Sequence, residues 1–524
     1  MFGRRRITSQ AQWLRTGYVA MALIGTLVAG GWYAFSPLPV SFGQQTTCWQ
    51  PDESIASLEQ QSSQNQTNWS GFLPIHGSVE ALEWRIALTE SAQNSIDAQY
   101  FMWHMDEVGK LLLERLLQAA DRGIKVRLLL DDLMGGLDRE WILANKHRNL
   151  EVRLFNPFRT RANNWLARGP EWLMGISRLN HRMHNKLFMV DRELAIVGGR
   201  NISNEYFGLG SQLDYRDFDL LASGPIARQL DESFETFWNS AWTYSPKKLT
   251  EYRAKTDDLD DFRRETREWL SKAEKLDGIL ASPSHDWPLM LAEANEKFIK
   301  ARARVIYDCP PGTLSGTPVQ RVVASVRDLL DRTGNELFLV SPYVILSSSV
   351  RDRLYAAEDR GVSIRLLTNS LESTDQNLPF SAYANRRKEL LNTGIDIYEM
   401  KAHGKQWQRY RAPLSSGQYL SVHAKMILFD DDKLMVGSLN LDPRSKYLNT
   451  EIALLIRSKE LADSIMEQFD RDLATPNSWQ VHLDDQGSQY WKSGHGEFYD
   501  EPARSFLQRA QVFFFSLLPI DSQL

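Results

Sequence analysis

Hydrophobic residues recur with the periodicity of a strand in some segments and with that of a helix in others, which predicts strands and helices in succession along the chain. Residues 79–92 have a helical pattern, and residues 96–103 form an apolar, aromatic-rich stretch typical of a strand. Leucines recur at helical spacing over 107–120, the pattern stops at Gly123, and residues 125–130 are again strand-like. A strand, a helix and a strand in this order predict a right-handed crossover. The fold class is therefore α/β, with a mainly parallel sheet.

The same succession returns in the second part of the chain. Residues 335–344 are strand-like and residues 350–358 are helical. Residues 359–367 (DRGVSIRLL) then match residues 121–129 (DRGIKVRLL) almost position for position. This repetition predicts two similar halves, each a mixed, mainly parallel sheet flanked by helices.

An apolar run over residues 17–35 is close to the ~20 residues that a membrane helix needs. Four arginines lie before it, and the next basic residue after it is Arg85. This asymmetry predicts a transmembrane anchor with residues 1–16 in the cytoplasm and the main chain on the other side. A cleaved signal peptide is the alternative interpretation.

Composition shifts predict the remaining boundaries. These are a polar linker (36–75), the first half (76–245), a charged helical connector (246–300), the second half (301–475) and a C-terminal tail with an apolar helix (476–524). Two further segments are rich in apolar residues. Residues 156–180 interleave arginine with tryptophan and leucine, typical of a surface loop or of a lip that engages lipid headgroups. Residues 506–518 predict a helix that either docks on the core or lies at a membrane interface.

Composition narrows the class of function. The chain has 524 residues, a net charge of −5 and a pI near 6.1, so it lacks the basic footprint of a nucleic-acid-binding protein. Its two cysteines, Cys48 and Cys309, are too few for a metal cluster, and we expect no disulfide framework. No zinc, calcium or H-E-x-x-H spacing is present, so we expect neither a metal nor a cofactor.

One motif occurs twice with every internal interval kept. Residues 184–201 (HNKLFMVDRELAIVGGRN) and 423–440 (HAKMILFDDDKLMVGSLN) share H-x-K, four residues, D, six residues and G-[G/S]-x-N. A single match could occur by chance in a chain of this length. Two copies with the same downstream glycine and asparagine indicate a duplicated functional unit.

The motif predicts a hairpin that gathers polar side chains at one end. Because residues two apart share a face of a strand, His184 and Lys186 project together, and the returning strand brings Asn201 back beside them. The second copy repeats the arrangement with His423, Lys425 and Asn440. An imidazole, an ammonium and an amide are suitable groups for a phosphate, and two histidines are what a two-step displacement requires.

The paired motif resembles that of the phospholipase D superfamily, whose two HKD motifs come together from two similar halves at one active site. More narrowly, residues 177–186 (SRLNHRMHNK) and 437–445 (GSLNLDPRS) resemble bacterial cardiolipin synthases, especially the cardiolipin synthase C branch. The resemblance extends from about residue 76 to residue 475.

The resemblance implies a metal-free route through a phosphatidyl-histidine intermediate. Because family members often use the first motif for attack, His184 is assigned the attack on phosphorus and His423 the protonation of the departing headgroup; the symmetry of the two motifs also allows the reverse. The residues expected around the phosphate oxygens are Lys186, Lys425, Asn201 and Asn440. An acidic residue downstream of each asparagine is expected to orient a histidine: Glu451, and Asp217 at a less regular spacing. Asp191 and Asp430 complete the catalytic motifs, although their place at the far end of the strand favours a structural role.

The resemblance also implies a function, which is transfer of a phosphatidyl group to phosphatidylglycerol. The donor is phosphatidylethanolamine or a second phosphatidylglycerol. With water as the acceptor, the protein would be a phospholipase D. A nuclease of the same superfamily and an inactive membrane-tethered scaffold are weaker alternatives, given the acidic pI, the membrane segment and the two intact motifs. The expected location is the bacterial inner membrane, with one span and the catalytic part on the periplasmic or outer face.

Overall fold

The computed structural model describes Cys48 and residues 69–517, apart from 134–137, 162–164, 251, 256, 277–285, 312–319, 414 and 495. The predicted anchor at 17–35 and most of the predicted linker lie outside these residues. Within the described part of the chain, no helix combines the length and the apolar character needed to span a bilayer.

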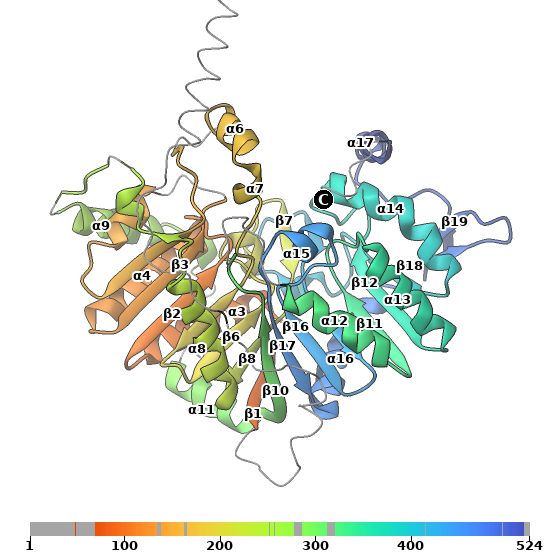
Figure 1. The fold of residues 1–524 in the computed structure, drawn as a ribbon, viewed down its shortest axis with the longest axis horizontal. Coiled ribbons are helices and arrows are strands. Elements are labelled where there is room, and N and C mark those ends of the chain that lie inside the picture. The colour runs from red at the N-terminus through yellow and green to blue at the C-terminus, as the bar shows by residue number, and fades with distance from the viewer. Residues whose placement is uncertain are drawn as a thin grey trace, which may run out of the picture.

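The first half is a mixed sheet with helices on its faces (Figure 1). Its strands in spatial order are β4 (Leu150–Phe155), β3 (Lys125–Asp131), β2 (Ser95–Tyr100), β5 (Leu187–Val190), β6 (Leu194–Gly198), β8 (Asp219–Ser223) and β1 (Ser70–Ile75). The short β9 (Thr243–Tyr244) pairs with β4. The main helices are α3 (Ser78–Ser91), α4 (Glu107–Asp121), α5 (Asp138–Ala144) and α8 (Pro225–Trp238).

The second half repeats this order. Its strands are β13 (Asp396–Met400), β12 (Ser363–Asn369), β11 (Glu336–Val340), β15 (Met426–Phe429), β16 (Lys433–Gly437), β17 (Ile452–Arg457) and β10 (Ile299–Tyr307). Its helices include α12 (Arg321–Arg332), α13 (Ser348–Asp359), α14 (Asn377–Asn392) and α16 (Lys459–Leu473). Beyond β13 the sheet continues through β18 (Ser478–Leu483), β19 (Gln489–Ser493) and β20 (Gly496–Phe498).

The two halves meet along two strand pairings. The edge strands β1 and β10 pair antiparallel, which makes the two sheets continuous. A separate parallel pair joins β7 (Leu213–Arg216) to β14 (Tyr419–Val422). Alternate residues of β5 face opposite sides, so that Phe188 packs into the core of the first half while Met189 packs into a core shared with Met426 and other residues of the second half. This shared core fixes the halves against one another.

Two of the fold predictions need correction. The strand–helix–strand units are parallel as predicted (β2–β3–β4 and β11–β12–β13), and the sheet is mixed as predicted, but most of the remaining pairings are antiparallel, so it is not mainly parallel. The reason is that each motif hairpin inserts beside β2 or β11 and carries antiparallel neighbours with it. The boundaries also differ, because residues 70–75 and 478–498 belong to the sheet and not to a linker or a tail.

Contrary to the sequence expectation, Cys48 and Cys309 form a disulfide bond, with their Cα atoms 5.9 Å apart. The two residues are separated by 261 positions, so no local spacing signalled the bond. Cys309 is the second residue after β10, and Asp308 between them is hydrogen-bonded to the backbone of Glu451. The bond therefore holds Cys48 close to the candidate site described below.

Several helices lie outside the two sheets. The connector contains α9 (Asp258–Leu270), which packs on α4, and α11 (Trp287–Lys297), which packs on α3. Four more helices are α6 (Trp165–Met174), α7 (Ile176–Leu179), α15 (Pro443–Tyr447) and α17 (Phe506–Ser516). In Figure 1 these four lie toward the upper side of the molecule, whereas α11 and β1 lie at the opposite end.

Candidate active site

Each motif folds as the predicted hairpin. In the first copy β5 and β6 are joined at Asp191 and Arg192, which have φ values of 53° and 58°. Left-handed residues at such a turn match the right-handed twist of the two strands. In the second copy β15 and β16 are joined after Asp430, which has a φ of 53°. The histidines and lysines therefore sit just before β5 and β15, at the ends of the strands opposite the turns.

His184 is held by Glu451, a residue of the other half. The Nδ1 atom of His184 lies 2.9 Å from one carboxylate oxygen of Glu451 and 3.1 Å from the other. Glu451 also accepts hydrogen bonds from the hydroxyls of Ser438 and Ser445. The backbone of His184 is fixed as well, because its N–H donates to the carbonyl of Thr450 at 2.9 Å. The imidazole thus presents its Nε2 atom for chemistry.

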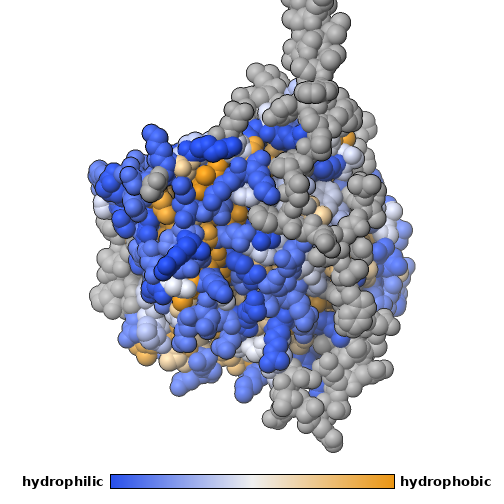
Figure 2. Space-filling model, turned by 60° about the vertical axis from the view of Figure 1, so that its left-hand side comes forward, coloured by the Kyte–Doolittle hydropathy of each residue, from blue (hydrophilic) through white to orange (hydrophobic). Residues whose placement is uncertain are grey.

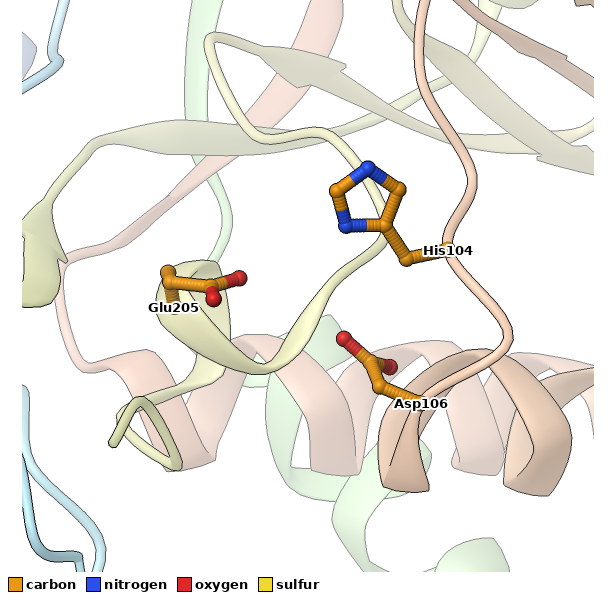
Figure 3. Close-up of side chains that lie close together, drawn as sticks. All are labelled: His104, Asp106 and Glu205. Atoms are coloured by element: carbon orange, nitrogen blue, oxygen red, sulfur yellow. The ribbon is translucent and has the colours of Figure 1, made fainter. Parts of the chain in front are cut away.

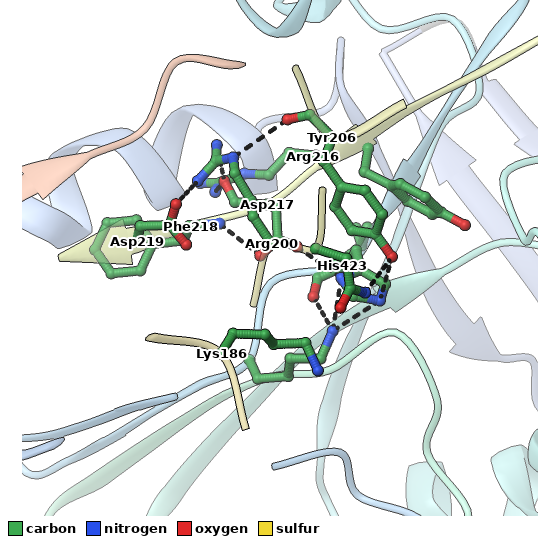
Figure 4. Close-up of polar contacts among 12 residues, drawn as sticks. Lys186, Arg200, Tyr206, Arg216, Asp217, Phe218, Asp219 and His423 are labelled. Carbon is green, nitrogen blue, oxygen red and sulfur yellow. Dashed lines mark hydrogen bonds and ion pairs between the residues drawn. The ribbon is translucent and has the colours of Figure 1, made fainter. Parts of the chain in front are cut away.

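His423 is held in the same way by Asp217 of the first half. The Nδ1 atom of His423 lies 2.6 Å from a carboxylate oxygen of Asp217. Asp217 follows β7 and His423 follows β14, so the parallel pairing of these strands brings the two residues together. Arg200 and Arg216, both buried, each donate to the backbone carbonyl of Asp217 at 2.9 Å. Figure 4 shows Asp217 and Tyr206 gathered around the His423 imidazole, with Lys186 extending toward the same place.

The carboxylates are therefore exchanged between the halves. The sequence showed that Asp217 lies farther from Asn201 than Glu451 lies from Asn440, which weakened the match. Strand register restores the equivalence: Gly198 pairs with Asp219 and Gly437 pairs with Ala453, so each carboxylate stands two residues before the partner of a motif glycine. The extra residues of the first half form β7 and the short helix η2 (Asn204–Phe207).

Two lysines bring positive charge into this buried site. Lys186 and Lys425 expose only 2% and 3% of their surface. The Nζ atom of Lys186 donates to the carbonyl of His184 at 2.6 Å, and Nζ of Lys425 lies 2.8 Å from Nδ1 and 3.1 Å from Nε2 of His423. Burying two ammonium groups is costly unless anions compensate them. A phosphate group between the lysines would supply such an anion.

The two motif asparagines differ in their side-chain hydrogen bonds. The side-chain oxygen of Asn201 accepts the N–H of Met102 at 3.2 Å, and its amide donates to the hydroxyl of Tyr206 at 3.0 Å. That hydroxyl lies 3.3 Å from Nε2 of His423, the reacting edge of the ring. Sequence reasoning did not single out Tyr206, because no motif marks it. Among the residues that the structure describes, the buried side-chain oxygen of Asn440 has no hydrogen-bond partner.

The motif aspartates lie away from the histidines. The carboxylate of Asp191 accepts three backbone N–H groups, those of Gln93, Asn94 and Ser95, at 2.6–2.8 Å. Asp430 accepts the N–H groups of Gly334 and Asn335. Each aspartate thus ties the turn of its hairpin to the segment that enters β2 or β11. This geometry favours the structural role over a catalytic one.

One group of side chains among the described residues could hold a cation. His104, Asp106 and Glu205 place ligand atoms within 4.8 Å of one another (Figure 3). Asp106 already caps α4 by accepting the N–H of Gly109, and Glu205 accepts the hydroxyl of Ser203. Both carboxylates are thus already hydrogen-bonded within the protein, and the mechanism proposed below uses none of these three residues.

Burial shifts the ionisation of the site. It lowers the pKa of His184 well below the usual value, helped by the charge of Lys186, and it lowers the pKa of His423 to about 3. Both rings are therefore neutral before substrate binds. Burial also raises the pKa of Glu451 to about 7 and lowers the pKa of Lys425 to about 8.

These shifts predict a bell-shaped pH dependence of kcat/KM. Below about pH 7 Glu451 takes up a proton and can no longer stabilise positive charge on His184 as a carboxylate, so activity falls; above about pH 8 Lys425 loses its charge, so activity falls again. Initial rates between pH 5 and 10 measure the profile. A Glu451→Gln variant should lose the acid limb. A monotonic profile through the neutral range would contradict the paired roles.

The fold and the site together define a class of enzyme: two similar halves that contribute matched histidine–lysine motifs to a single buried centre. The chain belongs to the cardiolipin synthase family with a phospholipase D-like domain. The family described as "Cardiolipin synthase, PLD-like domain" matches residues 86–238 and 326–473, which contain both motifs.

Relatives with known names agree with this assignment. Cardiolipin synthase C of Escherichia coli is 32% identical over 459 residues, covering 86% of this chain and 95% of that protein. A cardiolipin synthase of Listeria welshimeri is 25% identical, covering 77% of this chain and 68% of that protein. The fold is similar to the crystal structure of a phosphatidylserine synthase from Haemophilus influenzae, with a TM-score of 0.54 and 13% identity over 82% of this chain and 92% of that one.

Proposed function

We propose that the protein is a phosphatidyltransferase of the cardiolipin synthase type. The observation that carries this proposal is the exchanged pairing of His184 with Glu451 and of His423 with Asp217, with two buried lysines between them. One histidine attacks phosphorus, the other donates a proton to the leaving group and then accepts one from the acceptor, and the lysines neutralise the charge of the phosphate. A related protein named cardiolipin synthase C, similar over nearly its whole length, supports a second phospholipid as acceptor.

In the first step Nε2 of His184 attacks the phosphorus of the donor lipid. A P–N bond forms and the P–O bond to the headgroup breaks, while His423 gives its proton to the departing oxygen. Glu451 stabilises the positive charge that develops on His184. Because His423 is neutral in the empty site, the ring takes up a proton from solvent when the anionic substrate binds, since the charge of the substrate raises the pKa of the ring.

In the second step the acceptor's hydroxyl replaces the headgroup. His423, now neutral, removes the proton of that hydroxyl, the oxygen attacks phosphorus, and the P–N bond to His184 breaks. Lys186 and Lys425 stabilise the negative charge of both transition states. With two phosphatidylglycerols the products are cardiolipin and glycerol; with phosphatidylethanolamine as donor the second product is ethanolamine.

The test uses the purified full-length protein with vesicles of phosphatidylglycerol, with and without phosphatidylethanolamine, followed by separation of the lipid products. We expect cardiolipin, formed faster when the ethanolamine lipid is present. Phosphatidic acid as the sole new lipid would mean that water is the acceptor and that the protein is a phospholipase D. No new lipid at all would reject both functions.

We also propose that the catalytic part lies outside the cytoplasm, with residues 17–35 as the membrane anchor. The Cys48–Cys309 disulfide supports this location, because such bonds persist in oxidising compartments and are rare in the cytosol.

The redox state of the two cysteines in growing cells tests this location. Cells are quenched in acid and their thiols are modified with a maleimide polymer that slows the protein on a gel. We expect no shift in mobility until a reductant is added, and then a shift by two polymer chains. A full shift without reductant would place the catalytic part in the cytoplasm.

A further inference from the structure

Large exposed apolar side chains are concentrated on four helices that lie on one side of the molecule. They are Trp172, Leu173 and Ile176 of α6 and α7, Tyr447 of α15, and Phe506, Leu507, Phe513, Phe514 and Leu517 in or directly after α17. We call this set the apolar rim. Elsewhere in the described chain the exposed large apolar side chains are Trp69, Trp269, Leu289, Phe498 and Tyr499. Figure 2 shows one flank as a largely hydrophilic surface, with hydrophobic residues in a strip and in small scattered patches.

The apolar rim stands on the same side of the molecule as the active site. Figure 1 places α6 and α7 over the first half, α17 over the second half, and α15 between them. The helix α15 follows Asn440 by two residues, and its Ser445 donates to the Glu451 carboxylate at 2.7 Å. The rim therefore flanks the catalytic centre from both halves.

The helix α17 is fixed to the protein along one side only. Gln508 and Val512 are buried, Gln511 accepts a hydrogen bond from Asn377 of α14, and the carbonyl of Ser516 accepts one from Asn385. The opposite side carries Phe513 and Phe514, which are 68% and 60% exposed. The sequence left two alternatives open for this segment, docking on the core or lying at an interface. Its buried side docks, and its other side is free for a second partner.

The excess of basic over acidic residues on these helices favours an anionic partner. Their basic residues are Arg168, Arg178, Arg444, Lys446 and Arg509, and their only acidic residue is Glu171, which is buried. Yet the whole chain carries a net charge of −5. Exposed aromatic and aliphatic side chains together with basic residues are typical of helices that lie in the headgroup region of an anionic membrane.

We propose that the apolar rim is a bilayer-docking surface that seats the mouth of the active site on anionic phospholipid. The proposal rests on the proposed function for the identity of the substrate, which lies in that bilayer. The length of chain between the predicted anchor and the disulfide agrees with this proposal. The predicted anchor ends at residue 35 and the disulfide holds Cys48 beside the site, so the intervening chain spans at most roughly 45 Å. That length keeps the site side of the protein near the membrane.

Photo-crosslinking tests the contact directly and without turnover. The full-length protein is reconstituted in vesicles of phosphatidylglycerol and phosphatidylethanolamine that contain a phospholipid with a photoreactive acyl chain, and the adducts are mapped on peptides. We expect adducts in α6, α7 and α17 and none in α11, which lies at the opposite end. Adducts that spare α17 and α6 would overturn the proposal, whether or not the protein makes cardiolipin.

A matched pair of variants tests the consequence for catalysis. The variant Leu173→Glu/Phe513→Glu/Phe514→Glu should lower the ratio of turnover on vesicles to turnover on a monomeric short-chain phospholipid at least tenfold. The control Leu289→Glu changes a side chain on α11 that is 54% exposed and should leave this ratio unchanged. An unchanged ratio in the triple variant, or an equal fall in the control, would reject the docking surface. If the wild-type protein turned over neither the vesicles nor the short-chain phospholipid, the result would instead reject the proposed function.

Discussion

The His184→Ala and His423→Ala variants are each expected to lose about 10³-fold or more in turnover while keeping the wild-type fold. We expect the fold to tolerate alanine at either position, since each ring lies between a carboxylate and an aromatic side chain of the site. Each, however, makes or breaks a bond in both steps. Rates with vesicle substrate and thermal unfolding of each variant measure the two effects.

A matched control separates catalysis from general damage. His147 is a histidine of the first half that also contacts a carboxylate, Asp121, but it lies near the surface. The His147→Ala variant should therefore keep its turnover within about twofold of the wild type, as expected for surface changes away from a site. Full activity in both His184→Ala and His423→Ala would remove the basis for the site.

Replacing the exchanged carboxylates has the second-largest expected effect. The Asp217→Asn and Glu451→Gln variants should each lose about 10²-fold or more, because the amide no longer stabilises the charged ring and favours the wrong tautomer of the histidine. The effect should follow the pairing seen in the structure rather than position in the sequence: Asp217 acts through His423, and Glu451 acts through His184.

A substrate with a good leaving group distinguishes these two pairings. Phosphatidyl-p-nitrophenol releases p-nitrophenolate without a proton from the enzyme, so the first step no longer needs a general acid. The burst of product should be restored in Asp217→Asn and His423→Ala but not in Glu451→Gln or His184→Ala. Asp97→Asn, which changes a buried carboxylate paired with Arg127, serves as the control. Restoration in Glu451→Gln instead would reverse the assigned roles.

Local patterns predicted the features that depend on neighbouring residues. Both hairpins, the parallel strand–helix–strand units and the joint projection of His184 and Lys186 follow from periodicities of two and 3.6 residues. The resemblance to the phospholipase D superfamily indicated that the two motifs meet at one active site. Strand β1 was missed because its six residues follow a polar stretch and gain their stability from pairing with β8 and β10.

Long-range contacts explain what the sequence could not predict. Each histidine and its carboxylate are more than 200 positions apart, 267 for His184 and 206 for His423, so no spacing showed which carboxylate serves which ring. The Cys48–Cys309 bond and the approach of Tyr206 to His423 have the same origin. In each case the packing of the two halves determines which residues meet, and this packing cannot be read from the spacing of residues in one sequence.

The most direct test of the proposed mechanism is to trap the covalent intermediate. The His423→Ala variant is mixed with phosphatidyl-p-nitrophenol carrying a labelled phosphate, the reaction is quenched at alkaline pH, where phosphohistidine survives, and the labelled peptide is identified. We expect stoichiometric label on His184, since the variant can form the intermediate but has no base to activate the acceptor. Label on another residue, or turnover of the wild-type protein with no covalent label in either protein, would contradict a displacement by His184.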